Sequence, residues 1–251
     1  MAESNAAGDT PIWARPEPAG RRPRFSREQI AAAALAIADA EGFEAVSMRK
    51  IAAALGAGTM SLYRYIATKA DLMALLDDAL LGEALVPENE MPPGWREALA
   101  TVARRTRATL LRHTWAVHAL YSPEGAQNER AGPNGLRHFE QSLAALDGAP
   151  LDIQAKSELL AIVDDYVIGH ALQAGGLIAR FGGSRTIPAS VIEEFVAAQL
   201  ASGEYPHVQE LLAGPSAQSL IDPDRLEERF EHGLRLLIDG FVGSASGRQS
   251  D

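Results

Sequence analysis

Two short helical segments separated only by Gly-Ala-Gly at residues 56–58 constrain the fold of this 251-residue chain most strongly. Ser47 can cap the first segment, and Ala52 is small where two helices would have to cross closely. In the second segment Leu62 and Ile66 stand four residues apart, as on one buried helical stripe. A three- or four-residue turn containing glycine between short helices is typical of a helix-turn-helix.

The rest of the chain also predicts helices, and no stretch alternates as a strand does. Ser26 and Gln29 can form a capping box for a helix that ends at Gly42. Thr68, followed by an aspartate three residues later, can cap a long fourth helix that continues to about Glu83. Helical stretches follow at 95–122 (one long or two broken helices), 132–148, 151–181, 188–203 and 222–243. We therefore predict an all-α protein.

Composition narrows the class of protein. The hydrophobic content of 47% is ample for a packed core, and no apolar run approaches the roughly 20 residues of a membrane span. The N-terminus does not resemble a secretory signal, and the absence of cysteine excludes disulfides and thiolate sites. The net charge is −10, but residues 21–76 carry +3 and residues 82–251 carry −9. This uneven charge suits a cytoplasmic protein with one anion-facing end.

The outer side of the segment after the glycine bend carries a mixture of residues typical of neither a core nor an ordinary solvated surface. A serine here can hydrogen-bond a base edge, a methionine can contact a thymine methyl group, and an arginine can reach a guanine. Tyrosine, lysine and serine suit phosphate contacts that fix the register. We expect this face to bind a DNA major groove through Ser47, Arg49, Thr59, Met60, Ser61, Tyr63, Arg64, Tyr65 and Lys69.

A second interpretation fits the same spacing. The two segments could form a helical hairpin in a bundle, with Tyr63 and Tyr65 half-buried. Residues 1–24, rich in proline, glycine and arginine, predict a flexible arm. Arg24 and the other arginines of this arm either contact DNA, as N-terminal arms do elsewhere, or make no contact.

Residues 26–76 closely resemble the DNA-binding domain of TetR-type bacterial transcriptional regulators. The resemblance rests on Glu41–Gly42–Phe43, Arg49–Lys50–Ile51–Ala52, Leu55–Gly56, Leu62–Tyr63–Arg64–Tyr65–Ile66 and Lys69, in order and spacing. The segment Gly58–Thr59–Met60–Ser61 belongs to the part that varies in the family and usually sets operator preference. The resemblance therefore implies DNA binding without identifying the operator.

The resemblance also implies a domain organisation and a partner. A flexible arm (1–24) would precede a helix-turn-helix domain (25–70), and a helical effector-binding and dimerisation domain (71–245) would precede a disordered tail (246–251). The fourth helix would link the two domains. The regulator would be a homodimer whose two recognition helices read a palindrome in double-stranded DNA, with half-sites roughly 34–36 Å apart.

Paired glycines indicate close helix packing late in the chain. Gly233 and Gly240 are seven residues apart on one helical face, as are Gly169 and Gly176. Each glycine costs a helix roughly 1 kcal/mol relative to alanine, so close approach of another helix is a fair reason for it. A monomeric core helix is the alternative. The family dimerises through a four-helix bundle, which implies an interface at Phe230, Gly233, Leu234, Leu237 and Phe241.

Aromatic and ionisable side chains interrupt the apolar helices between residues 95 and 212. Adjacent Asp164 and Asp165 lie about 100° apart on a helix, so we expect that they do not both face solvent. A mostly apolar cavity with a few hydrogen-bonding groups would suit a small molecule, although each histidine or tryptophan could also be an ordinary core residue. The candidate effector pocket comprises Trp115, His118, Tyr121, His138, Phe139, Asp165, Tyr166 and His170.

Enzyme, cofactor and metal interpretations find no support in the sequence. It contains no His-Glu-x-x-His, no Gly-x-Ser-x-Gly and no phosphate-binding loop, and its six histidines show no ligand spacing. We expect no cofactor, no metal and no membrane partner. The predicted function is that of a ligand-responsive repressor released from DNA by an unidentified small-molecule effector. The alternatives are a constitutive DNA-binding regulator and a helical small-molecule binding protein with a vestigial DNA head.

Overall fold

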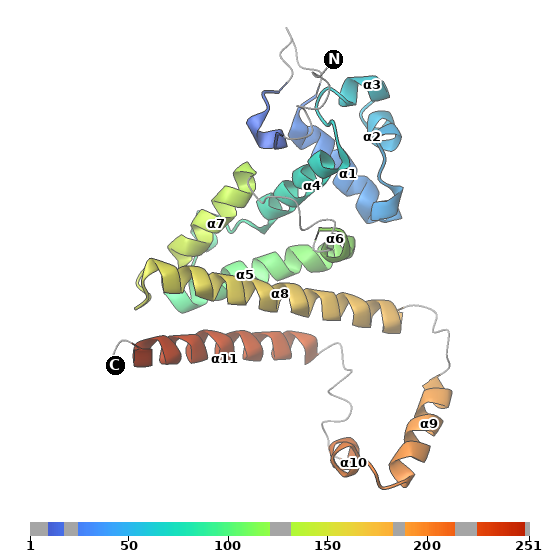
Figure 1. Ribbon diagram of the computed structural model, residues 1–251, viewed down its shortest axis with the longest axis vertical. Coiled ribbons are helices and arrows are strands. Elements are labelled where there is room, and N and C mark those ends of the chain that lie inside the picture. Colours follow the sequence, from blue (N-terminus) through green and yellow to red (C-terminus); the bar gives the residue numbers. More distant parts are fainter. Residues whose placement is uncertain (1–9, 18–24, 121–131, 183–188, 214–224, 249–251) are drawn as a thin grey trace.

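The computed structural model of the protein describes residues 10–17, 25–120, 132–182, 189–213 and 225–248. The described residues form helices and the loops between them, with no strand, which confirms the all-α prediction (Figure 1). The α-helices are α1 (Arg27–Glu41), α2 (Met48–Ala54), α3 (Thr59–Leu62), α4 (Lys69–Ala84), α5 (Trp95–Arg112), α6 (Thr114–Leu120), α7 (Pro133–Ala145), α8 (Ile153–Gly182), α9 (Ala189–Ala201), α10 (Pro206–Ala213) and α11 (Arg225–Arg248). Three short 3₁₀ turns are η1 (Ile12–Ala14), η2 (Phe43–Ala45) and η3 (Glu88–Glu90).

The first three α-helices form a compact unit that we call the head. The predicted capping box of α1 is present, since the Ser26 hydroxyl accepts from the Gln29 amide and the Gln29 side chain accepts from the Ser26 amide. Between α2 and α3, Gly56 adopts a φ of +61°, which other residues rarely adopt. The Ala57 amide then donates to the Ala52 carbonyl at 2.8 Å. This bend turns α3 across α2 and confirms the helix-turn-helix.

Helix α3 is shorter than the sequence predicts. It ends at Leu62, and a tight turn follows in which the Tyr65 amide donates to the Leu62 carbonyl at 2.8 Å. Ile66 is nevertheless buried beside Leu62, as the predicted stripe requires. The turn keeps both apolar side chains in the head core although regular α-helical geometry has ended.

Helix α4 joins the head to the remaining helices, α5–α11, which we call the body. Its Thr68–Asp71 capping box is present, as predicted. It packs against α1 on the head side and against α5 and α7 on the body side (Figure 1). Leu75, Leu76 and Leu80 are therefore all buried. The linking role predicted for the fourth helix is confirmed by these contacts.

The body is built around the long helices α8 and α11, which lie side by side (Figure 1). Phe230 of α11 is fully buried and its ring stacks on Tyr166 of α8, with centroids 5.5 Å apart. Gly233 lets this approach happen, because a Cβ at Gly233 would collide with the Tyr166 hydroxyl. Close packing thus explains Gly233, but the packing partner is a helix of the same subunit.

Several helix boundaries in the body differ from, or refine, those that the sequence predicts. The stretch 95–122 is two broken helices, α5 and α6, which meet at His113. The sequence does not predict α10 as a separate helix. It packs mainly on α9, and these two helices stand away from the rest of the body (Figure 1). Helix α11 continues to Arg248, so the predicted disordered tail at 246–251 begins too early; residues 249–251 lie outside the described part.

The predicted flexible arm requires a correction. Residues 1–9 and 18–24 lie outside the described part of the chain, but Ile12 is one of the most buried side chains in the protein, at 2% exposure. Trp13 packs against the same core, and Arg15 forms an ion pair with Asp71 of α4. Two apolar side chains and one charge pair anchor this segment, which lacks the periodicity that would mark it as structured.

A buried carboxylate fixes α7 to α4. One oxygen of Asp78 accepts from the backbone amides of Asn134 and Gly135, at 2.8 and 3.0 Å, and the other accepts from the Asn134 side chain. Burial raises the pKa of Asp78, and the amide donors only partly oppose this shift. Gly132 makes the contact possible, because a Cβ there would collide with both Asp78 and Trp13.

Replacing Asp78 with alanine should destabilise the protein by about 1–3 kcal/mol, because two amides at the buried start of α7 lose their acceptor. Urea unfolding followed by circular dichroism measures this change in the free energy of unfolding. Asp147→Ala is the matched control: its side chain is 82% exposed and pairs only with Lys156, so it should change stability by less than about 0.5 kcal/mol. Equal effects of the two substitutions would contradict the role of Asp78.

Candidate nucleic-acid interface and ligand groove

The outward surface of α2, α3 and the start of α4 forms what we call the reading face. Met60 is 78% exposed and Tyr63 is 50% exposed, so a thioether and a phenol are both presented to solvent on this surface. The other exposed or half-exposed members of the predicted contact set are Ser47, Arg49, Thr59, Ser61, Arg64 and Lys69. The predicted contact residues other than Tyr65 and Arg24 are therefore exposed or half-exposed on these elements.

Buried side chains on the opposite side of the same elements hold the reading face in place. Ala52, Leu62 and Ile66 are each at most 2% exposed. Because α3 is only four residues long, its orientation depends on these inward contacts rather than on its own hydrogen bonds. The inward stripe of the sequence thus determines which side chains point outward.

Two members of the predicted contact set need comment. Tyr65 is only 7% exposed and belongs to the head core, so a phosphate contact through its ring is not supported. The reason is the tight turn after Leu62, which directs Tyr65 inward. Arg24 lies outside the described residues. Among neighbouring cations, Lys50 pairs with Glu41, and the Lys69 ammonium lies 6.0 Å from the ring centre of Phe43.

The predicted effector pocket does not form as one site. Trp115 lies at the junction of head and body, where its indole stacks on Phe43 at 5.5 Å and donates to Asp39 of α1 at 2.8 Å. His118 is exposed on α6, and Phe139 is 50% exposed on α7. Tyr121 lies outside the described residues. These positions correct the expectation that the aromatic side chains converge.

The remaining predicted pocket residues make structural contacts within the body. His138 is buried and its Nε2 lies 3.0 Å from the Thr106 hydroxyl. Tyr166 donates to the Phe230 carbonyl, and His170 accepts from the Arg107 guanidinium at 3.3 Å. Burial, together with that guanidinium, lowers the pKa of His170, which favours the neutral acceptor form. Asp165 is exposed and Asp164 is half-buried, which agrees with the expectation that the two adjacent aspartates do not both face solvent.

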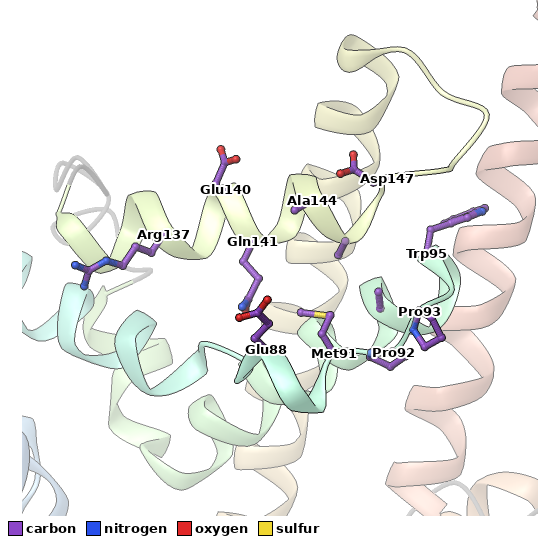
Figure 2. A pocket seen from close by; sticks show the side chains of 12 residues that line it. Glu88, Met91, Pro92, Pro93, Trp95, Arg137, Glu140, Gln141, Ala144 and Asp147 are labelled. Atoms are coloured by element: carbon purple, nitrogen blue, oxygen red, sulfur yellow. The ribbon is translucent and has the colours of Figure 1, made fainter.

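A groove of about 460 Å³ lies instead between α7 and the segment from η3 to the start of α5. Figure 2 shows Gln141 pointing from α7 toward Glu88 and Met91, with Trp95 and the two prolines at the other end. Gln141 closes this wall by donating to the Val86 carbonyl and accepting from the Val86 amide. The lining is mostly apolar and comprises Glu88, Met91, Pro92, Pro93, Trp95, Ala98, Arg137, Glu140, Gln141, Ala144, Ala145 and Asp147.

The size and lining of this groove suit a small organic molecule, since ligand pockets typically measure about 300–1,000 Å³ and are mostly apolar. Sequence reasoning missed it because the stretch 86–94 reads only as a proline-rich break between helices. The signal in the sequence is that Pro92, Pro93 and Trp95 place three apolar side chains close together. A connecting loop would ordinarily be polar at such positions.

The predicted dimer residues divide between two environments. Phe230 and Leu234 are buried inside the subunit, at 0% and 1% exposure, so they cannot face a second copy. Leu237, Phe241 and Gly233 are half-buried against the body. The outward face of α11 carries Leu236 instead, 60% exposed, beside exposed Gly240. The apolar stripe of α11 binds its own subunit.

The described helices and side chains also bear on two other kinds of site. None of the described helices combines the length and apolar character needed to cross a membrane. In the same residues, no group of three or more histidine and carboxylate side chains is arranged to hold a metal ion.

Comparisons with known proteins agree with the geometry of both parts. The family described as bacterial regulatory proteins, tetR family, matches residues 30–76, and the tetracyclin repressor-like C-terminal domain matches residues 87–243. The HTH-type transcriptional repressor DrrR1 of Streptomyces coeruleorubidus is 32% identical over 239 residues, which cover 92% of this chain and 83% of that protein. The tetracycline repressor protein class E of Escherichia coli is 27% identical over 153 residues, which cover 60% and 69% of the two chains.

A solved structure has the same arrangement of helices. The TetR family protein ActR of Streptomyces coelicolor, in complex with actinorhodin, superposes with a TM-score of 0.67 at 28% identity, covering 88% of this chain and 98% of that chain. Both matched families consist of regulators, which confirms the prediction of a regulator rather than an enzyme. With its N-terminal and C-terminal parts both matched in order, this chain belongs to the TetR family of bacterial regulatory proteins.

Proposed function

We propose that this protein is a transcriptional repressor that binds a palindromic operator as a homodimer in the cytoplasm and is released from it by a small molecule. The reading face carries the proposal: Arg49, Met60, Tyr63 and Arg64 are exposed on elements that buried side chains hold from behind. Guanidinium, methyl-bearing and phenolic groups are the kinds of side chain that contact guanine, thymine and phosphate.

A second copy of the chain would complete this geometry, because two reading faces at a fixed separation can read a palindrome. Exposed apolar side chains on α8 and α11 include Ile162, Leu172 and Leu236, and Gly169 and Gly240 on the same two helices are also exposed. Small residues there leave room for two helices of the second copy to complete a four-helix bundle. We place the subunit interface on this face.

The neighbouring α9–α10 hairpin supports the same interface. It exposes Val191, Phe195, Tyr205, Val208, Leu211 and Leu212 while packing mainly on itself. Apolar side chains gathered on a projecting hairpin indicate contact with another chain. A second copy that buries both surfaces would remove them from water together.

The effector part of the proposal rests on the groove beside α7 and on the likeness to ActR, whose structure holds actinorhodin. Helix α7 both lines the groove and is fixed to α4 through Asp78. A ligand that shifts α7 therefore moves the helix that carries the head. A coupling of about 1–3 kcal/mol would change operator affinity by roughly 5–150-fold.

Replacing Arg49 or Tyr63 with alanine should each weaken binding to the operator by about 1–3 kcal/mol, because each removes a contact from the reading face. The operator is first obtained as a duplex that the wild-type protein selects from random-sequence DNA, and affinity is measured by fluorescence anisotropy. Arg105→Ala, which removes a cation paired with Glu90 on the body, is the control and should bind as wild type does. Failure of the wild type to select any duplex would contradict the proposal.

Replacing Leu236 with arginine should convert the dimer into a monomer, because a charge on the α11 face would be buried without a partner. Sedimentation equilibrium measures the mass directly. Leu136→Arg on α7 is a matched control, since Leu136 is 62% exposed and Leu236 is 60% exposed. A Leu236→Arg protein that remains dimeric would place the interface elsewhere.

Replacing Ala144 with tryptophan should fill the groove without disturbing the core, because Ala144 is exposed on α7. Small molecules are screened for release of the wild-type protein from its labelled duplex. For a releasing compound, the variant should require at least about tenfold more, equivalent to about 1.4 kcal/mol of lost binding. Equal release of both proteins would show that the effector binds elsewhere.

A further inference from the structure

We propose that Arg15, held on a strap of residues 11–17, is a positioning residue for DNA reading: it fixes the loop that joins α3 to α4. The inference rests on the proposed DNA-binding function. It extends that function to a segment that precedes both matched family regions, which span residues 30–76 and 87–243. Arg15 acts through Asp71 and has no need to touch DNA itself.

The strap is attached to three parts of the protein. Ile12 is buried in the core at 2% exposure, and Trp13 lies against Gly132 at the start of α7. On α1, the Arg27 guanidinium donates to the Arg15 carbonyl at 2.9 Å, and the Arg27 amide lies 3.4 Å from the Glu17 carboxylate. Arg15 is therefore held at a defined place relative to α1 and α7.

Asp71 connects this anchored arginine to the reading face. The Arg15 guanidinium pairs with one oxygen of the Asp71 carboxylate. The other oxygen accepts from the backbone amides of Ala67 and Thr68, at 2.8 and 3.0 Å. These amides belong to the loop directly after Ile66. Ile66 is buried in the head core and holds the end of the turn that follows α3. Arg15, Asp71 and the loop thus form one continuous chain of contacts.

The electrostatics of Asp71 make the guanidinium necessary. The residue is only 7% exposed, and burial alone would raise the pKa of its carboxyl group. The hydrogen bonds from Arg15, Ala67 and Thr68 outweigh that effect and lower the pKa. Without Arg15 the buried carboxylate loses its ion-pair partner, which favours uptake of a proton or a turn toward water. Either change weakens its hold on the two loop amides.

A loosened loop lowers DNA affinity in a recognisable way. If only a fraction of the heads hold α3 in the reading position, the apparent affinity equals the intrinsic affinity multiplied by that fraction. The dependence of affinity on salt should not change, because Arg15 neutralises Asp71 and releases no counterion from DNA. An arginine bound to phosphate would behave differently, since its loss reduces the salt slope by about 1 for each contact.

The experiment compares Arg15→Ala, Arg15→Lys and Arg105→Ala with the wild type on the duplex that the wild type selects. We expect Arg15→Ala to bind about tenfold more weakly with an unchanged salt slope, and Arg15→Lys to lie between it and the wild type. Without DNA, the amides of Ala67 and Thr68 should exchange hydrogen at least about tenfold faster in Arg15→Ala. In an Asp71→Asn background, Arg15→Ala should have little further effect, because the two substitutions break the same pair.

Three results would overturn the inference: wild-type affinity and exchange in Arg15→Ala, a salt slope reduced by about 1 per head, or equal effects of Arg15→Ala with and without Asp71. If Arg15→Ala does not fold, Arg15→Lys decides, and wild-type binding and exchange in that variant overturn the inference. A wild type that selects no duplex would contradict the proposed function instead. The exchange measurement, which uses no DNA, would still test whether Arg15 positions the loop.

Discussion

Burial of α4 on nearly every side is the constraint on which both parts of this protein depend. Leu75, Leu76 and Leu80 are at most 3% exposed, because α1 covers one side of the helix while α5 and α7 cover the others. Each fully buried leucine stabilises the fold by about 1.5–3 kcal/mol. The head therefore cannot turn against the body while α4 stays still. Relative motion of the two parts requires α4 to shift within a close-packed interior, which favours a few discrete positions over continuous drift.

Two carboxylates on α4, seven residues apart, show how the environment divides similar groups. Asp71 has a guanidinium partner and a lowered pKa, so its contribution to stability is present above the pKa of the unfolded chain and is lost on acidification through the lower folded value. Asp78 is held by amide donors and has a raised pKa because of burial. Its ionised form is disfavoured by burial, a penalty that acidification removes. The first turn and the middle of α4 therefore respond to pH in opposite directions.

The sequence was informative wherever local chemistry determines structure. Both capping boxes, the glycine bend and the Leu62–Ile66 stripe follow from side chains acting over four residues or fewer, and the structure contains them all. The reading face then follows as the remainder of the same helices. Tyr65 is the exception among the predicted contact residues. Helix α3 ends at Leu62 and a tight bend directs Tyr65 inward, which helical periodicity does not predict.

Prediction failed where the neighbour of a helix decides the role of a side chain. The apolar stripe of α11 predicts contact with a second subunit, but Phe230 and Leu234 pack inside their own subunit. Tyr166 and Trp115 looked like pocket residues because they are amphipathic, yet each joins two elements by a stack and a hydrogen bond. Ile12 gave no signal, since an irregular segment has no periodicity to reveal its burial. Periodicity identifies a buried face without identifying what covers it.

The crowding at Gly132 affects how this protein could be recombined with its relatives. That position has no space for a side chain because the Asp78 carboxylate and the Trp13 ring both occupy it. A chimera that exchanges DNA specificities by joining a foreign head at residue 25 would separate the strap from the α1 and α4 surfaces it fits. Residues 11–17 should therefore be transplanted together with α1–α4, and α7 of the recipient must offer a glycine where the incoming tryptophan lands.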